Sequence, residues 1–251
     1  MAHHVLAFTE SLDAGGVLSY VAPAVDQQIR PVGNGIVVPA FNNLVGAAAL
    51  TGATALHTKL VSPSLRARNP YAINPLAGGI VPVDGDSFPM FPQSPVALTV
   101  DEELDAQEDG NPAAAEQVTV LVFLAPGTLA PINGKIFTVA FSITCALVAG
   151  SWVYTPIALD DDLPVGVYDV VGAELRAATA TAFRLVFVGG TLRPGAPCRQ
   201  AIGHQTNEWF RYGQLNTWGS FQTVQPPSVE IISSAAAASA TYVGVLDLIA
   251  H

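Results

Sequence analysis

Hydrophobic and small residues alternate along the segment 137–147. The large apolar residues at every second position are Phe137, Val139, Phe141, Ile143, Cys145 and Leu147. A period of two is typical of a β-strand, whose side chains point to opposite faces in turn. No charge falls between Lys135 and Asp160, so the run is long enough to cross a bilayer as a helix. A membrane helix has no reason to alternate, and we therefore predict two strands in 137–159, joined by a turn at 149–151.

Glycine and proline divide the rest of the chain into short segments that are typical of strands joined by turns. The segments VTVLVFL (118–124) and FRLVFV (183–188) are apolar at consecutive positions, which is typical of strands buried between two layers. The strands expected before residue 96 are short, at 4–8, 17–21, 36–38 and 56–60. A longer series follows at 96–100, 117–124, 136–147, 152–159, 165–176, 181–188, 228–233 and 241–249.

Three stretches depart from this pattern. Apolar residues recur at helical spacing from Phe41 to Ala49, which predicts a short helix over 41–50 that ends near Gly52. The segment 62–95 is rich in Pro and Gly and is expected to be an irregular connection that contacts a neighbouring subunit. The segment 101–112 (DEELDAQEDGNP) is expected to be an acidic loop.

The strand count defines the expected fold. About eight strands from Val96 onward match an all-β, jelly-roll β-sandwich over 96–251. A long irregular N-terminal region with one short helix, 1–95, is expected to precede it as an extended arm packed on the same domain or on neighbours. A single domain over 1–251 is the alternative.

Composition points toward association. Hydrophobic residues make up 50% of the chain and charged residues only 12%, and a surface so poor in charge favours contact with other subunits. The net charge is −10, and Lys59 and Lys135 are the only lysines. We therefore expect no direct binding of nucleic acid. The first residues lack the pattern of a secretory signal.

The sequence contains no recognisable catalytic motif. No zinc-protease, nucleophile-elbow or nucleotide-binding pattern occurs, and His57, His204 and His251 are isolated. The carboxylates of 101–109 are contiguous, unlike the separated pair of a glycosidase. We therefore predict a protein that is not an enzyme, with no cofactor and no catalytic residue.

Two smaller features leave alternatives open. Asp160, Asp161 and Asp162 are weak candidates for Ca²⁺ ligands, because hard cations take several oxygens, but a solvated turn explains them as well. Cys145 and Cys198 are the only cysteines, and each is either a small buried apolar residue or one half of a disulfide.

Aromatic residues are concentrated in the stretch NEWFRYGQLNTWGSF (207–221). One hypothesis is packing at a subunit interface or under a loop, because aromatics anchor cores and interfaces. The other is a platform for stacking sugars. With the aromatics of the Pro-rich connection, the candidates for subunit contact are Phe88, Phe91, Trp209, Phe210, Tyr212, Trp218 and Phe221.

The C-terminal 90 or so residues carry a family resemblance. The matching residues are Pro164, Gly166, Tyr168, Val170 and Gly172, then Arg184, then Trp218-Gly219, then Pro226-Pro227. This pattern resembles the jelly-roll major capsid proteins of small tailless, icosahedral bacterial viruses, in which the Pro-x-Gly-x-Tyr strand pairs with an Arg-containing apolar strand. The resemblance carries no catalytic residue.

The resemblance implies a structural protein of a virion, made in the host cytoplasm. It implies a homo-oligomer, as a trimeric or hexameric capsomer, together with other capsid proteins. The lack of a basic arm implies that an internal membrane or minor proteins separate this shell from the genome. The leading hypothesis is thus a bacteriophage capsid subunit that self-assembles. The alternative is a carbohydrate-binding β-sandwich of a cell surface or viral spike.

Overall fold

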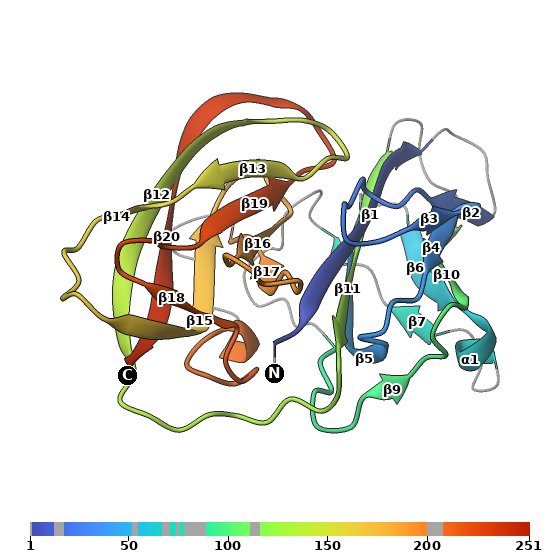
Figure 1. Cartoon of the computed structure of the whole chain (residues 1–251). Helices are drawn as coiled ribbons and strands as arrows, with labels where there is room; N and C mark the ends of the chain where they lie inside the picture. Colours follow the sequence, from blue (N-terminus) through green and yellow to red (C-terminus); the bar gives the residue numbers. More distant parts are fainter. Residues whose placement is uncertain are drawn as a thin grey trace.

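The computed structural model describes residues 2–12, 18–51, 55–66, 71–73, 76–77, 89–110, 116–199 and 208–251. It confirms the all-β prediction, because strands make up most of these ranges (Figure 1). Their helical elements are one turn of α-helix, α1 (Pro63–Arg66), and one 3-10 turn, η1 (Glu208–Phe210). Neither is of a length that could cross a membrane.

The first half of the chain forms two sheets. Sheet A has the order β1–β11–β5, beyond which both β8 and β9 pair with β5. Sheet B has the order β3–β4–β10–β6–β7, with β2 also paired to β10. The strands are β1 (His4–Leu12), β2 (Leu18–Val21), β3 (Pro31–Val32), β4 (Gly35–Val37), β5 (Asn43–Thr51), β6 (Ala55–Val61), β7 (Tyr71–Ile73), β8 (Leu76–Ala77), β9 (Val96–Ala97), β10 (Glu103–Gly110) and β11 (Glu116–Ala125).

The second half forms two further sheets. Sheet C has the order β14–β12–β20–β15–β18, and sheet D has the order β13–β19–β16–β17. Every pair within them is antiparallel. The strands are β12 (Phe137–Leu147), β13 (Val153–Pro156), β14 (Ala158–Leu159), β15 (Val167–Arg176), β16 (Ala182–Val186), β17 (Gly195–Pro197), β18 (Gly219–Gln222), β19 (Ser228–Ile232) and β20 (Ala237–Ala250).

The two halves repeat one topology. Strands β1, β2, β5, β6, β7, β9, β10 and β11 correspond in order to β12, β13, β15, β16, β17, β18, β19 and β20. In each half, one sheet has the order first–eighth–third–sixth, and the other has the order second–seventh–fourth–fifth. This is the strand order of an eight-stranded jelly roll. The described chain is therefore two jelly rolls in tandem.

The repeat extends to single residues. In sheet A a β-bulge lies where Phe123 pairs with Gly46. In sheet C a β-bulge lies at the corresponding place, where Asp247 pairs with Gly172. Both glycines are covered closely: a Cβ on Gly46 would collide with Met90 Sδ, and one on Gly172 would lie 2.8 Å from Arg211 Cα. The same local geometry therefore recurs in both halves, with glycine where a neighbouring segment crosses the strand.

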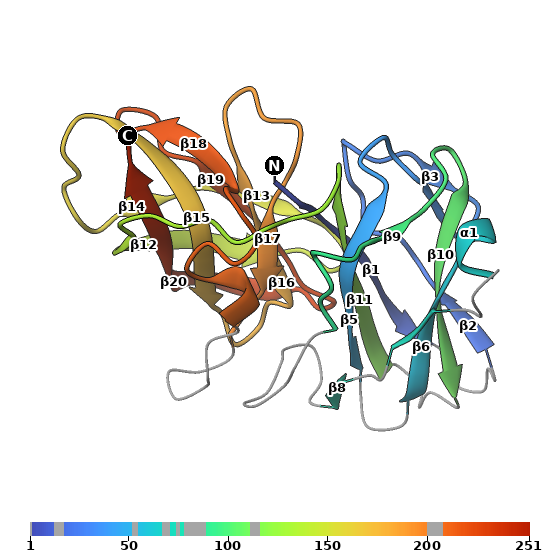
Figure 2. The same ribbon diagram turned by 90° about the horizontal axis from the view of Figure 1, so that it is seen from below.

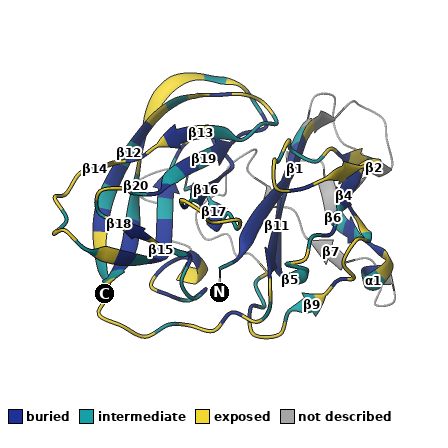
Figure 3. Ribbon diagram, viewed as in Figure 1, coloured by how far each residue is buried: buried dark blue, intermediate teal, exposed yellow. Residues whose placement is uncertain are grey.

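Sheet A is buried on both faces. In β11, Val120 and Val122 pack in the core between sheets A and B, whereas Leu121 and Phe123 face the second jelly roll. The sheets therefore stack in four layers, in the order C, D, A and B (Figure 2). Figure 3 shows β1 and β11 buried between the two halves. The expectation that 118–124 lies between two layers is confirmed.

The predicted helix over 41–50 is wrong, because this segment is β5. Its apolar residues are small and nearly continuous, with Ala47, Ala48 and Ala49 all buried. A short continuous apolar run does not distinguish a helix from a strand buried on both faces. Sheet B covers one face of β5 and the second jelly roll covers the other, so the segment forms a strand.

The predicted acidic loop over 101–112 is also wrong in its central part, because 103–110 is the strand β10. Leu104 and Ala106 point into the core, whereas Glu103 and Asp105 are more exposed. The period-two pattern was present, but the charges obscured it. Strands β10 and β11 both pair with strands that precede residue 95. The first half therefore ends at Ala125, and the second half begins at Phe137.

The second half follows the sequence more closely. Strand β12 alternates between buried and more exposed residues, and Gly150 makes the expected turn with a φ of +68°. Cys145 and Cys198 are free thiols.

The pairing expected from the family resemblance is wrong. Strand β15 lies in sheet C and β16, which carries Arg184, lies in sheet D, so these two strands do not pair. Jelly-roll topology puts the third and fourth strands in opposite sheets.

Candidate functional site

Arg184 is the centre of a buried polar cluster where the two jelly rolls meet. It lies on the face of sheet D that is turned toward sheet A, and it is 2% exposed. Its Nε donates to Glu230 Oε2 at 2.6 Å, and its Nη1 donates to Asp26 and to the Val5 carbonyl. The guanidinium also lies over the Trp152 ring, 4.1 Å from its centroid. One side chain therefore joins sheet D to two segments of the first jelly roll.

His4 extends this cluster as a neutral side chain. The Arg193 backbone N–H donates to His4 Nδ1 at 3.1 Å, and His4 Nε2 lies 3.4 Å from Asp26 Oδ2. With Nδ1 accepting, the proton is on Nε2. Burial lowers the pKa of His4. Burial alone would raise the pKa of Asp26, but hydrogen bonds from His4 and Arg184 and the charge of Arg184 hold it well below its ordinary value.

His3 occupies an apolar site on the other side of β1. Its Nε2 lies 2.8 Å from the Gly195 carbonyl, and its ring meets Trp218 edge-on at 5.0 Å. The rings of Phe123 and Phe210 lie close by. Burial is the main cause that lowers the pKa of His3, to about 4. His3 is therefore uncharged at neutral pH and joins the cores of both halves.

A second buried pair holds the segment 208–213 against sheet C. Arg211 binds Asp247 with two hydrogen bonds, Nε to Oδ2 at 2.6 Å and Nη2 to Oδ1 at 2.8 Å. Asp247 also accepts from the Tyr212 N–H and from Thr138 Oγ1. Burial alone would raise the pKa of Asp247, but these bonds and the Arg211 charge lower it. Arg211 Nη1 also lies 3.4 Å from Glu174 Oε2.

Both clusters are suited to holding segments together. Their charged groups are paired within the chain, and a buried ion pair fixes geometry because an unpaired charge there is costly. His3, His4, Asp26 and Glu230 were not expected at a site from the sequence. For His3, His4 and Glu230 the available signal was a charged or histidine side chain in or next to an apolar strand, whereas Asp26 lies outside the strands and carries no such signal. The same signal marks Arg184 within FRLVFV.

The aromatic candidates fall into two groups. Phe210, Trp218 and Phe221 are buried in the core of the chain itself, so they are not available to a second subunit or to a sugar. Phe91 is partly buried against the first jelly-roll core. Trp209 is 38% exposed and Tyr212 is 53% exposed, and these two stay candidates for subunit contact. Phe88 lies outside the described residues.

The three aspartates 160–162 are exposed at the end of β14. Asp161 Oδ2 accepts from the Ala140 N–H at 3.4 Å, and Asp160 Oδ1 accepts from Ser142 Oγ at 3.4 Å. These bonds attach the turn to β12. Over the described ranges, no three His, Cys, Asp or Glu side chains gather in a way that could hold a metal ion.

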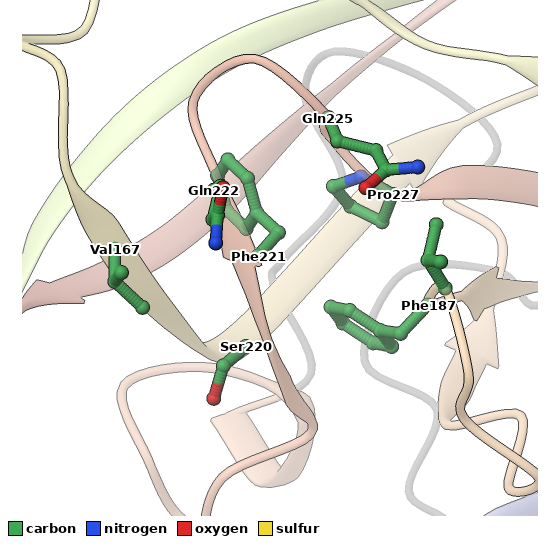
Figure 4. Close-up of a pocket in the computed structure, with 8 residues that line it drawn as sticks. Val167, Phe187, Ser220, Phe221, Gln222, Gln225 and Pro227 are labelled. Carbon is green, nitrogen blue, oxygen red and sulfur yellow. The ribbon is translucent and has the colours of Figure 1, made fainter.

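A shallow cavity of about 290 Å³ lies beside the edge strand β18 (Figure 4). Its walls include Phe221 and Gln222 on β18, Gln225 and Pro227 in the segment that follows, and Phe187. None of its eight lining residues carries a titratable side chain. The cavity therefore offers apolar contact and amide hydrogen bonds, without a group for acid–base chemistry.

Comparison with known proteins gives little. No protein-family model matches the chain, and its sequence matches no curated protein. Among solved structures, the chain is similar to one described as the crystal structure of the major capsid protein P2 from bacteriophage PM2. The match covers 99% of this chain and 98% of that chain, with a TM-score of 0.26 and 10% sequence identity.

Proposed function

We propose that this protein is a structural subunit that self-assembles into a viral capsid. The observation that carries the proposal is the internal repeat: one chain supplies two jelly rolls of the same strand order, joined by a shared core. A rigid block with two similar units is suited to tiling, because each unit offers the same kind of faces to its neighbours.

The surface chemistry supports the same proposal. Only 12% of the residues are charged, and exposed apolar side chains include Val25, Tyr154, Val165, Val188 and Val224. A surface of this kind favours permanent contact with other subunits. The buried charged groups of the two clusters have structural partners, which favours a protein without catalysis. We propose a homo-oligomeric capsomer, trimeric or hexameric, in a bacteriophage virion.

The net negative charge of the chain affects which partners we propose. The net charge is −10, and neither lysine belongs to a basic arm. We therefore propose that the protein contacts other capsid proteins, and an internal membrane or minor proteins, rather than the genome directly.

Negative-stain electron microscopy of the purified protein, with light scattering on the same sample, tests the proposal. Closed shells or regular rings of capsomers are the expected result. A monodisperse monomer at all protein concentrations, pH values and salt concentrations would overturn it.

A further inference from the structure

The cavity beside β18 continues into a longer groove. A second cavity of about 420 Å³ adjoins it, and the two share Phe187, Val188 and Ser220 in their walls. Val188 is 71% exposed. None of the described residues that line either cavity carries a charge. The groove is therefore suited to an uncharged occupant, because a charged group would lose its hydration there without gaining a partner.

Strand β18 offers a backbone hydrogen bond to this groove. It is the last strand of sheet C, next to β15. The Thr223 N–H donates to the Gly166 carbonyl at 3.1 Å. Successive residues of antiparallel strands direct their backbone groups to opposite sides in turn, so the Gln222 N–H is directed away from β15. Figure 4 shows Phe187 and Gln225 on this side of β18, where the cavity is open.

The turn after β18 repeats the turn after β9 in the first jelly roll. The Gln225 N–H donates to the Gln222 carbonyl at 2.8 Å, and the Glu102 N–H donates to the Thr99 carbonyl at 3.3 Å. The register of β9 on β5 matches that of β18 on β15, counted from the bulge glycine of each sheet. Thr99 and Glu102 are therefore the counterparts of Gln222 and Gln225.

In the first jelly roll, α1 covers the edge beside this turn. The Thr99 N–H donates to Ser64 Oγ at 3.1 Å. Ser64 Oγ and the Ser64 N–H both donate to Glu102 Oε2, at 2.8 Å and 3.2 Å. The next residue, Leu65, is 2% exposed and belongs to the core of this half. A hydroxyl residue followed by a leucine therefore completes the edge of the first jelly roll.

The corresponding edge of the second jelly roll is open. Gln222 and Gln225 are exposed, and both line the cavity. The segment that follows β16, residues 187–192, forms a wall of the groove and does not fill it. The second half therefore has the acceptor and donor groups of this edge without the element that covers them in the first half.

We propose that this groove binds an uncharged segment of a partner protein in which a serine or threonine precedes an aliphatic residue. The hydroxyl accepts from the Gln222 N–H and donates to the side-chain carbonyl of Gln225, as Ser64 does with Thr99 and Glu102. The aliphatic side chain packs in the apolar part of the groove. This site goes beyond the proposed function, because it takes up a partner segment independently of assembly.

A peptide with the sequence of residues 61–65, VSPSL, acetylated and amidated at its ends, is the probe. Saturation-transfer NMR observes the peptide, so it measures binding to a monomer and to an assembled particle alike. We expect a dissociation constant on the order of 1 mM, because a short peptide loses conformational freedom on binding. The control peptide VSPAL lacks the hydroxyl and should bind about threefold or more weakly.

Two substitutions at Gln225 test the hydroxyl acceptor. Gln225→Glu should strengthen binding of VSPSL about threefold or more, since it supplies the carboxylate that Glu102 supplies in the first half. Gln225→Ala should weaken binding. Val224→Glu is the control for charge, because Val224 is 79% exposed and does not line the cavity.

A substitution at Gln222 tests the backbone donor. Gln222→Pro removes the N–H, and proline is tolerated on an edge strand where the N–H is directed outward. Gln222→Ala keeps the N–H and is the matched control. We expect only Gln222→Pro to lose binding of VSPSL, with circular dichroism unchanged in both variants.

The outcomes separate this site from the capsid proposal. Binding of VSPSL that exceeds binding of VSPAL and rises with Gln225→Glu supports the site, in a monomer as in a shell. The site is overturned if neither the wild type nor Gln225→Glu binds VSPSL at several millimolar peptide. Equal binding by Gln225→Glu, Gln225→Ala and Val224→Glu would overturn it as well.

Discussion

Asp26 and Arg184 are 158 residues apart in the chain, and they form a buried ion pair between the two jelly rolls. Arg184 also binds Glu230, so it holds its position within sheet D while it reaches into the first half. The pair fixes how the two halves meet, and its removal is the most direct test of that contact.

Arg184→Ala should destabilise the chain by about 3–5 kcal/mol, because Asp26 would be left buried without its cation. Urea unfolding at pH 7 measures the loss. Arg193→Ala is the control, since the Arg193 guanidinium bonds to the nearby carbonyls of Gly190 and Leu192. In a double-mutant cycle with Asp26→Ala, we expect a large coupling energy. Additive effects would show that the pair does not join the two halves.

Acid should weaken the fold through the buried histidines. The pKa of His3 is lowered from 6.5 to about 4, so the unfolded chain takes up a proton between these values and the folded chain does not. The free energy of unfolding therefore has its full value above pH 6.5 and falls as the pH drops toward 4. The loss that His3 causes is at most about 3 kcal/mol. The lowered pKa of His4 acts in the same direction.

Unfolding free energies at pH 7 and pH 4.5 measure this loss of stability. His3→Gln should make the free energy less dependent on pH in this range. His251→Gln, at the exposed end of the chain, should leave the dependence as in wild type. An unfolding free energy in wild type that stays constant from pH 7 to pH 4.5 would contradict the assignment.

Gly172→Ala should destabilise the protein by about 1–3 kcal/mol. The added Cβ would lie 2.7 Å from Asp247 Oδ2 and 2.8 Å from Arg211 Cα, and a backbone atom cannot move aside cheaply. The matched control is Gly166→Ala, where the nearest atom to the new Cβ is 3.7 Å away. Thermal unfolding compares the two. Equal thermal unfolding midpoints for the two variants would show that segment 208–213 does not pack closely against β15 at Gly172.

The two thiols should react at very different rates in the folded protein. Cys198 is 1% exposed, and burial raises the pKa of its thiol well above the ordinary value. Cys145 is partly exposed, with a smaller rise from the same cause. Thiolate is the reactive form, so a thiol reagent at pH 8 should label Cys145 first and Cys198 only on unfolding. Equal rates for both would contradict this placement.

The sequence by itself determined the class of fold and much of the second jelly roll. Strand β12 was predictable because one of its faces is buried and the other is more exposed. Its hydrophobic residues therefore recur with a period of two. The turn at Gly150 was predictable because glycine and serine interrupt the apolar run there. The low charge and the absence of catalytic motifs were also visible without coordinates.

Tertiary structure decided the rest. Strand β5 is buried on both faces by sheet B and by the second jelly roll, so its residues carry no alternation to distinguish it from a helix. The tandem repeat depends on long-range pairings such as β1 with β11, which local patterns do not contain. The cluster of His4, Asp26 and Arg184 exists only because two jelly rolls meet there. The pattern of residues around a position predicts which type of element forms there. Its contacts with residues far away in the chain depend on how the sheets pack.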